Sequence, residues 1–170
     1  MTRISRLLAV LPLLVATATV CWADEPVRTD VVRERSADVM PFEMMATTHV
    51  FTKSPTGGVQ RVVVKNAGAA QQIQLVRGHL RDIADKFRRR DFSGPEHVHG
   101  AQMPGLAALR GVPPQDLAVV YRDLPAGAEI EYSSSRASIV VALHQWFDAQ
   151  LADHGTDAIA GHDHAMPHHP

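Results

Sequence analysis

The chain contains one cysteine, Cys21, among its 170 residues. Cys21 ends an apolar N-terminal stretch of the secretory type, so signal removal leaves no thiol in the exported chain. This absence excludes disulfides, thiolate metal sites and a cysteine nucleophile. Any soft metal ligand must then be methionine, and any nitrogen ligand must be histidine.

The sequence also lacks an excess of basic charge and the common enzyme motifs. There are 17 Lys and Arg residues against 18 Asp and Glu residues, which predicts no basic face and therefore no nucleic-acid partner. No Gly-rich phosphate loop, nucleophile elbow or His-Glu-x-x-His helix is present. The motifs therefore indicate no particular reaction.

The N-terminus has the pattern of a signal peptide over residues 1–23. Arg3 and Arg6 precede the apolar run from 7 to 20, and small residues lead to a cleavage site after Ala23. We therefore predict a periplasmic or secreted protein that does not touch the membrane after cleavage. The run is short for a membrane span, although an uncleaved anchor is the alternative.

Residues 24–39 are charged and show no period, which predicts a mobile leader or an edge segment. Residues 40–158 predict a single α+β domain, and 159–170 form a histidine-rich tail. Alternation and helical spacing within the domain predict six elements. These are strands at 47–53 and 59–65, a helix at 69–89, strands at 117–123 and 129–134, and a helix at 136–153.

The order of these elements indicates an internal repeat of one ββα unit. Pro55 and Gly57 match Pro125 and Gly127 in the two hairpin turns, and coincidence is the alternative. Two such units can share one core. We therefore expect duplicated ββα units forming a four-stranded antiparallel sheet with both helices on one face.

The tail carries the clearest chemical pattern. It has little structural role, and neutral imidazole is a common ligand of copper, zinc and nickel. Copper is favoured over zinc or nickel by the affinity order of these ions. The candidate ligands of the tail are His162, His164, His168 and His169.

A second candidate metal site lies in the domain. His97 and His99 fall on one side of the loop at 91–104 if it is extended, and Met103 adds a thioether. His79 and His144 lie at the borders of the two apolar helix stripes and join this site if the fold brings them close. The alternatives are histidines that cap a helix, meet water, or hydrogen-bond to backbone or carboxylate.

Four segments carry a family resemblance, namely Met40-Pro41-Phe42, Thr48-His49-Val50-Phe51, residues 99–105 from His99-Gly100 to Pro104-Gly105, and residues 143–150 from Leu143-His144 to Ala149-Gln150. They resemble segments of a family of small exported bacterial proteins that often carry the label aspartate carbamoyltransferase. The carbamoyl-phosphate loop Ser-Thr-Arg-Thr of the true transferase is missing here, so no catalytic residue is carried over. The resemblance covers most of residues 38–158, and it implies a shared fold and shared positions His49, His79, His99, Met103, His144 and His154.

These observations lead to three function classes. The first is an exported transition-metal binding protein that buffers or delivers copper. The second is a metal-independent binding or interaction domain with an unknown protein partner. The third is a small enzyme, including the labelled transferase.

Overall fold

The computed structural model describes residues 28–162, which form an α+β domain with a five-stranded mixed sheet and five α-helices. The expected signal peptide, residues 24–27 of the leader, and the tail histidines His164, His168 and His169 lie outside these residues. No helix within 28–162 is long and apolar enough to cross a membrane.

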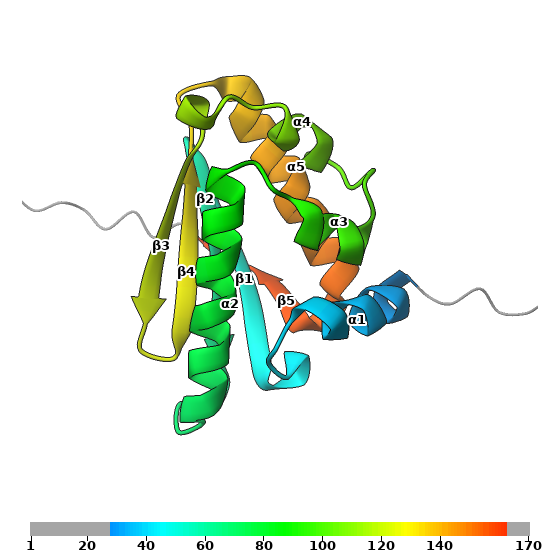
Figure 1. Cartoon of the computed structure of the whole chain (residues 1–170), viewed down its shortest axis with the longest axis vertical. Coiled ribbons are helices and arrows are strands. Elements are labelled where there is room, and N and C mark those ends of the chain that lie inside the picture. Colours follow the sequence, from blue (N-terminus) through cyan, green and yellow to red (C-terminus); the bar gives the residue numbers. More distant parts are fainter. Residues whose placement is uncertain (1–27, 163–170) are drawn as a thin grey trace, which may run out of the picture.

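The order of elements repeats as expected (Figure 1). The first unit contains β1 (Thr47–Ser54), β2 (Gly57–Val64) and α2 (Ala70–Arg88). The second contains β3 (Ala118–Leu124), β4 (Gly127–Ser133) and α5 (Ala137–His154). Between the units lie α3 (Ser93–His99) and α4 (Leu106–Arg110), α1 (Arg28–Val39) comes first, and β5 (Ala158–Ala160) comes last.

The sheet has the strand order β3-β4-β2-β1-β5. Its first four strands are antiparallel as predicted, but β5 pairs in parallel with β1. The expectation of a four-stranded antiparallel sheet is therefore wrong in strand number and in type. A three-residue strand that begins at the expected domain end is too short to show an alternating pattern.

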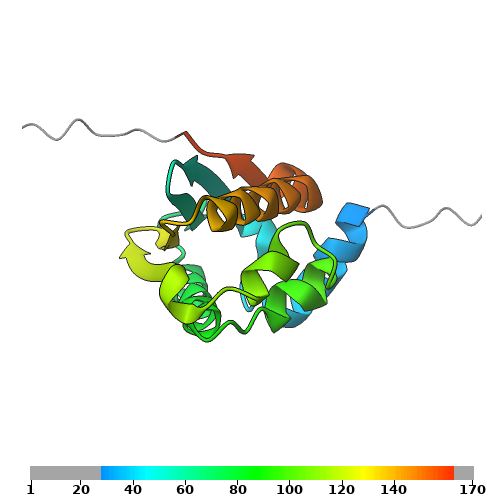
Figure 2. The ribbon, with the colours of Figure 1, turned by 90° about the horizontal axis from the view of Figure 1, so that it is seen from above.

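Both repeat helices cover the same face of the sheet, as expected. On that face, Phe51 of β1 contacts Phe147 of α5, and Tyr132 of β4 contacts Phe87 of α2, with ring centroids 5.2 and 6.0 Å apart. Alternate residues of the strands are buried there, so the apolar stripes of the helices close one core. Figure 2 shows α3 and α4 beside α5, away from the β3–β4 hairpin.

The leader segment differs from the prediction. Residues 28–39 form α1, which packs on α3 and α5 and buries Val32 and Ser36. Only two of its positions are buried, so the sequence carries no helical apolar stripe from which to predict it. The helix matters for the site because it carries Arg28 to the end of α5.

Candidate functional site

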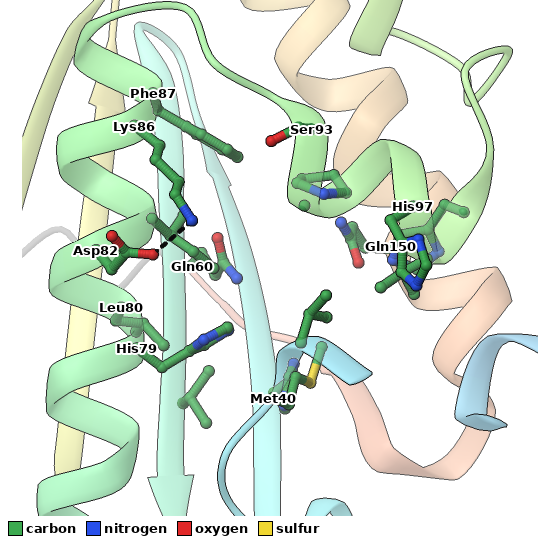
Figure 3. Close-up of a pocket in the computed structure, with 18 of the residues that line it drawn as sticks. Met40, Gln60, His79, Leu80, Asp82, Lys86, Phe87, Ser93, His97 and Gln150 are labelled. Carbon is green, nitrogen blue, oxygen red and sulfur yellow. Dashed lines mark ion pairs between the residues drawn. The ribbon is translucent and has the colours of Figure 1, made fainter. Parts of the chain in front are cut away.

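A cavity of about 240 Å³ opens between α2 and α3, above the sheet (Figure 3). Five histidines line it, and we call it the histidine pocket. His97 stands at its mouth, and the other four come from four different elements. They are His49 of β1, His79 of α2, His99 of α3 and His154 of α5. The remaining wall is largely apolar, with Val62, Leu80, Ile83, Phe87 and Val98.

Three of these imidazoles are buried, and one of them, His154, neighbours the other two. The ring centroids of His49 and His154 are 5.2 Å apart, and those of His154 and His99 are 5.1 Å apart. We call His49, His99 and His154 the buried trio. The fourth ring, His79, lies across Phe42, whose centroid is 5.5 Å from His79 and 6.1 Å from His49.

A carboxylate and a guanidinium fix the orientation of one member of the trio. His99 Nδ1 donates to Asp153 Oδ2 at 2.8 Å, and Arg28 binds both oxygens of Asp153. Because Nδ1 carries the proton in this pair, Nε2 of His99 keeps its lone pair. The pair is buried, so this tautomer is held firmly.

The pocket keeps its imidazoles neutral. Burial, together with the weaker effect of the neighbouring histidines, lowers the pKa of His49 to about 3. Burial also lowers the pKa of His79 and of His154 to about 4. Burial lowers the pKa of His99 as well, against the opposing effect of Asp153. All four rings are therefore uncharged at neutral pH, and an uncharged imidazole can bind a metal or accept a proton.

Burial raises the pKa of Asp153, but hydrogen bonds from Arg28 and His99 outweigh this effect, so the carboxyl pKa lies below its usual value. Asp153 is consequently ionised at neutral pH. An ionised carboxylate behind a neutral imidazole raises the basicity of the ring nitrogen that faces the pocket.

Two polar atoms at the pocket have no hydrogen-bond partner. They are Nε2 of His49 and Nε1 of Trp146, both fully buried. Gln60 and Gln150 direct their carboxamides into the same space from β2 and α5 (Figure 3). Because Tyr132 donates to Oε1 of Gln60, the amide nitrogen of Gln60 is left toward the cavity. Buried polar groups without partners are costly, and such groups around a cavity indicate a ligand site.

The mouth of the pocket is polar. Lys86 and Asp82 of α2 form an ion pair of 2.7 Å at one side, and Ser93 and His97 of α3 stand at the other (Figure 3). His97 is half exposed, and its Nε2 lies 3.1 Å from Asp38 of α1. The entrance thus joins three helices around an apolar interior.

The structure brings together some of the sequence-predicted ligands and separates others. His79 and His99 line the pocket, and His97 lies at its mouth. Met103 is a core residue behind His99. His144 points away from the pocket, because its Nε2 donates to the carbonyls of Ser54 and Gly57 at 3.1 and 2.8 Å.

The expected pairing of His97 with His99 depended on an extended loop, and this expectation is wrong. Residues 93–99 form α3 instead, so the two side chains diverge around a helix. The side chain of His97 is 51% exposed and that of His99 only 2%. Of the tail ligands, His162 is exposed at the end of the described residues, and the other three lie beyond them.

Sequence reasoning did not bring His49 and His154 together as a site, although the resemblance named both positions. A signal for His49 was present, since it alternates with Thr47 and Phe51 on the buried face of its strand. The spacing of Trp146, Gln150 and His154, four residues apart, also places all three on one face of α5. No sequence pattern indicated that Asp153 and Arg28 belong to the site.

Among residues 28–162, no group of three or more His, Cys, Asp and Glu side chains is arranged to hold a metal ion. The buried trio is therefore close but not assembled as a ligand set. Comparisons of the chain with protein families, curated proteins and solved structures found no significant match.

Proposed function

We propose that the protein binds a transition-metal ion in the histidine pocket, with the buried trio as ligands. The observation that supports this most directly is that Nε2 of His49 is buried without a hydrogen-bond partner. The ring of His49 neighbours that of His154, which in turn neighbours that of His99. These rings are neutral, as metal ligands must be. No other role in the described core uses the unpaired nitrogen of His49.

The spacing of the rings supports this proposal. A tetrahedral ion holds imidazole nitrogens at about 2.0–2.1 Å, which puts the centroids of two bound rings roughly 5 Å apart. The two ring separations in the trio, 5.2 and 5.1 Å, are of this size. Closing all three rings around one ion requires them to rotate about their side-chain bonds into the cavity.

The contact between His99 and Asp153 supports it as well. Histidines that bind metal usually donate their other ring N–H to a carboxylate or carbonyl, which fixes the tautomer of the ligand. His99 has this partner in Asp153, with Arg28 holding the carboxylate. This contact has the form of a second-sphere contact behind a metal ligand, which supports the proposal.

Copper is the metal we favour within this proposal. The thioether of Met40 lines the pocket near His79 (Figure 3), and thioethers with imidazoles suit Cu(I). Cu(II) binds nitrogen ligands more strongly than Ni(II) or Zn(II) does. A site whose rings must turn to close around the ion suits buffering or delivery, because the bound ion has to leave again.

Export and the tail belong to the same proposal. The expected signal peptide directs the chain to the periplasm or the outside of the cell. Imidazole ligands bind the ion there without any cysteine. The tail histidines then add a second, weaker site. This division predicts two classes of bound copper, one removed by replacing the tail histidines and the other by altering the pocket.

Metal counting on purified chain from Asp24 onward tests the proposal. With all four tail histidines replaced by alanine, we expect one tightly bound copper ion per chain. His49→Leu in that background should abolish binding, while the matched control His97→Ala should retain it. A tail-substituted chain that remains metal-free with copper, zinc and nickel at neutral pH would contradict the proposal.

Catalysis is the second candidate function, and the same pocket supports it. A concave site with convergent polar groups is what catalysis requires, and His99 with Asp153 has the arrangement of a base and its orienting carboxylate. In the presence of chelator, small amides and carboxylates should then raise the Tm of the tail-substituted chain. Gln150→Met should remove that rise, and no rise with any compound would count against this candidate.

A further inference from the structure

Two buried carboxamides line the histidine pocket, and the metal proposal does not use them. Gln60 of β2 and Gln150 of α5 are 7% and 5% exposed, and both side chains extend into the pocket (Figure 3). Because the oxygen of Gln60 accepts from Tyr132, its amide nitrogen remains to donate. The carboxamide of Gln150 can donate and accept. Buried carboxamides need hydrogen-bond partners, so this pair indicates that the pocket holds a polar molecule.

His79 adds a third polar group on the side of α2. Its ring points into the same space (Figure 3), and burial lowers its pKa to about 4, so it is neutral at pH 7. A neutral imidazole has one donor and one acceptor nitrogen. The three side chains together offer donors and acceptors without a charge.

The pocket has no buried charge with which to hold an ion of an organic molecule. Its charged lining residues are Asp82, Lys86 and Asp91, and none of them is buried. Lys86, the single base, already pairs with Asp82 at 2.7 Å. A carboxylate or an ammonium group carried into this space would lose its water without gaining a counter-ion, which is costly. These charges favour an uncharged molecule.

The size and walls of the pocket limit the rest of the molecule. Its volume of about 240 Å³ equals that of roughly eight water molecules at about 30 Å³ each, so it holds roughly eight to twelve non-hydrogen atoms. Leu80, Ile83, Phe87 and Val98 form apolar walls around this space. A short hydrocarbon or aromatic body therefore fits beside the polar groups.

We propose that the histidine pocket binds a small uncharged amide with an apolar body, whose amide group hydrogen-bonds to Gln60 and Gln150. An amide carries an acceptor oxygen for the nitrogen of Gln60 and a donor N–H for the oxygen of Gln150. The inference goes beyond the proposed metal site, since it requires no ion. It also narrows the enzyme candidate, which admits carboxylates as well as amides.

Calorimetric titration of the chain from Asp24 onward, with chelator present at neutral pH, tests the inference. Benzamide should bind at least about tenfold more tightly than toluene, which lacks the amide, and than benzoate and benzylamine, which are charged. Trp146 lines the pocket and is the only tryptophan of this chain, so its fluorescence should change as benzamide binds.

A matched pair of variants locates the bound amide. Gln150→Met keeps the length of the side chain but removes its polar atoms, and it should weaken benzamide binding about tenfold. Gln145→Met, on the exposed side of the same helix, is the control and should bind benzamide like the parent.

Each other outcome overturns the inference at an identifiable step. Toluene that binds as tightly as benzamide excludes recognition of the amide, and benzoate that does so excludes the preference for an uncharged molecule. Equal benzamide affinity in the parent and Gln150→Met, or binding without a change in Trp146 fluorescence, places the amide outside the pocket. Absence of benzamide binding overturns the whole inference. Copper binding is measured separately, so failure here is distinguishable from failure of the metal proposal.

Discussion

Arg77 of α2 and His144 of α5 make the same contact on opposite hairpins. Arg77 donates to the carbonyls of Leu124 and Gly127, and His144 donates to those of Ser54 and Gly57. The accepting residues are equivalent under the shift of 70 that relates the two hairpins. Each helix therefore fastens the hairpin turn of the other ββα unit, and the two units are interlocked.

The sheet register has the same symmetry. Gly57 pairs with Ser133, Val63 pairs with Gly127, and Gln60 pairs with Ile130, its own equivalent, at the centre. A shift of 70 exchanges the first two pairs with one another. A pseudo-two-fold axis thus passes between β2 and β4 and relates the hairpins.

Alanine at Gly57 or at Gly127 should destabilise the fold by about 3 kcal/mol or more, because the added Cβ meets backbone that cannot move away. It would lie 2.0 Å from the carbonyl oxygen of Tyr132 at Gly57 and 2.0 Å from that of Val62 at Gly127. Gly78→Ala is the control, since Gly78 lies in α2 with open space around it and should gain about 0.5–1 kcal/mol. Urea unfolding of the three variants measures these differences, and equal effects would refute the close approach.

Replacement of His144 by alanine should lower the free energy of unfolding by about 1–2 kcal/mol, because two carbonyls of the β1–β2 turn lose their donor. The same change should leave the copper affinity of the tail-substituted chain unaltered, since His144 does not line the pocket. Denaturant titration and metal titration check the two parts. A loss of bound copper would show that His144 is a ligand after all.

Acid should destabilise the metal-free protein. Its unfolded imidazoles take up protons near pH 6.5, whereas the folded pKa is about 3 for His49 and about 4 for His79 and His154. The unfolded state therefore binds more protons below pH 6.5, and each group costs up to about 1.4 kcal/mol per pH unit until its folded pKa is reached. The charged groups that face these rings are Arg28, Asp82, Lys86 and Asp153.

Asp153 acts in the same direction, because its stabilising contacts are lost only as the pH falls through its lowered folded pKa. Asp153 therefore adds to the loss only below about pH 4, and the buried histidines should lower the urea midpoint of the parent between about pH 6.5 and pH 4. His49→Leu removes one of the three strongly shifted groups and should flatten this slope. A midpoint that is constant between pH 7 and pH 5 would contradict the burial of neutral imidazoles.

Asp153→Asn should weaken copper binding about 10- to 100-fold, the usual cost of losing a carboxylate behind a metal-binding histidine. The amide has nearly the same shape but no charge, so the orientation and basicity of His99 are no longer fixed by Asp153. Asp148 lies on the exposed face of the same helix and pairs with Lys53 instead. Asp148→Asn therefore serves as the control. Competition with a chelator of known affinity measures both variants, and equal affinities would remove Asp153 from the site.

The repeat helices and the first four strands follow from the sequence because their patterns are strong. The apolar stripe of α2 and the alternation of Thr47, His49 and Phe51 depend on burial against one shared face, which local periodicity reports directly. Helix α1 and strand β5 carry no such pattern. Each is held by a few tertiary contacts, such as that of Gly161 with Phe51 beyond β5.

The site was less predictable than the fold. Histidine content pointed to imidazole chemistry, and His79 and His99 were among the predicted ligands. The grouping failed where it depended on loop conformation, because α3 separates His97 from His99. Helix register mattered as well. Arg77 and His144 hydrogen-bond to equivalent carbonyls of the two hairpins, so they occupy equivalent positions in the two units. His144 therefore makes a structural contact with a hairpin turn.

The most direct measurement is the imidazole NMR spectrum of the tail-substituted chain during titration with one equivalent of zinc, a closed-shell stand-in for copper. We expect the ring resonances of His49, His99 and His154 to shift together and to saturate at one ion per chain, while those of His97 and His144 remain in place. If zinc shifts only His97, or if no ring resonance responds, the histidine pocket does not bind metal.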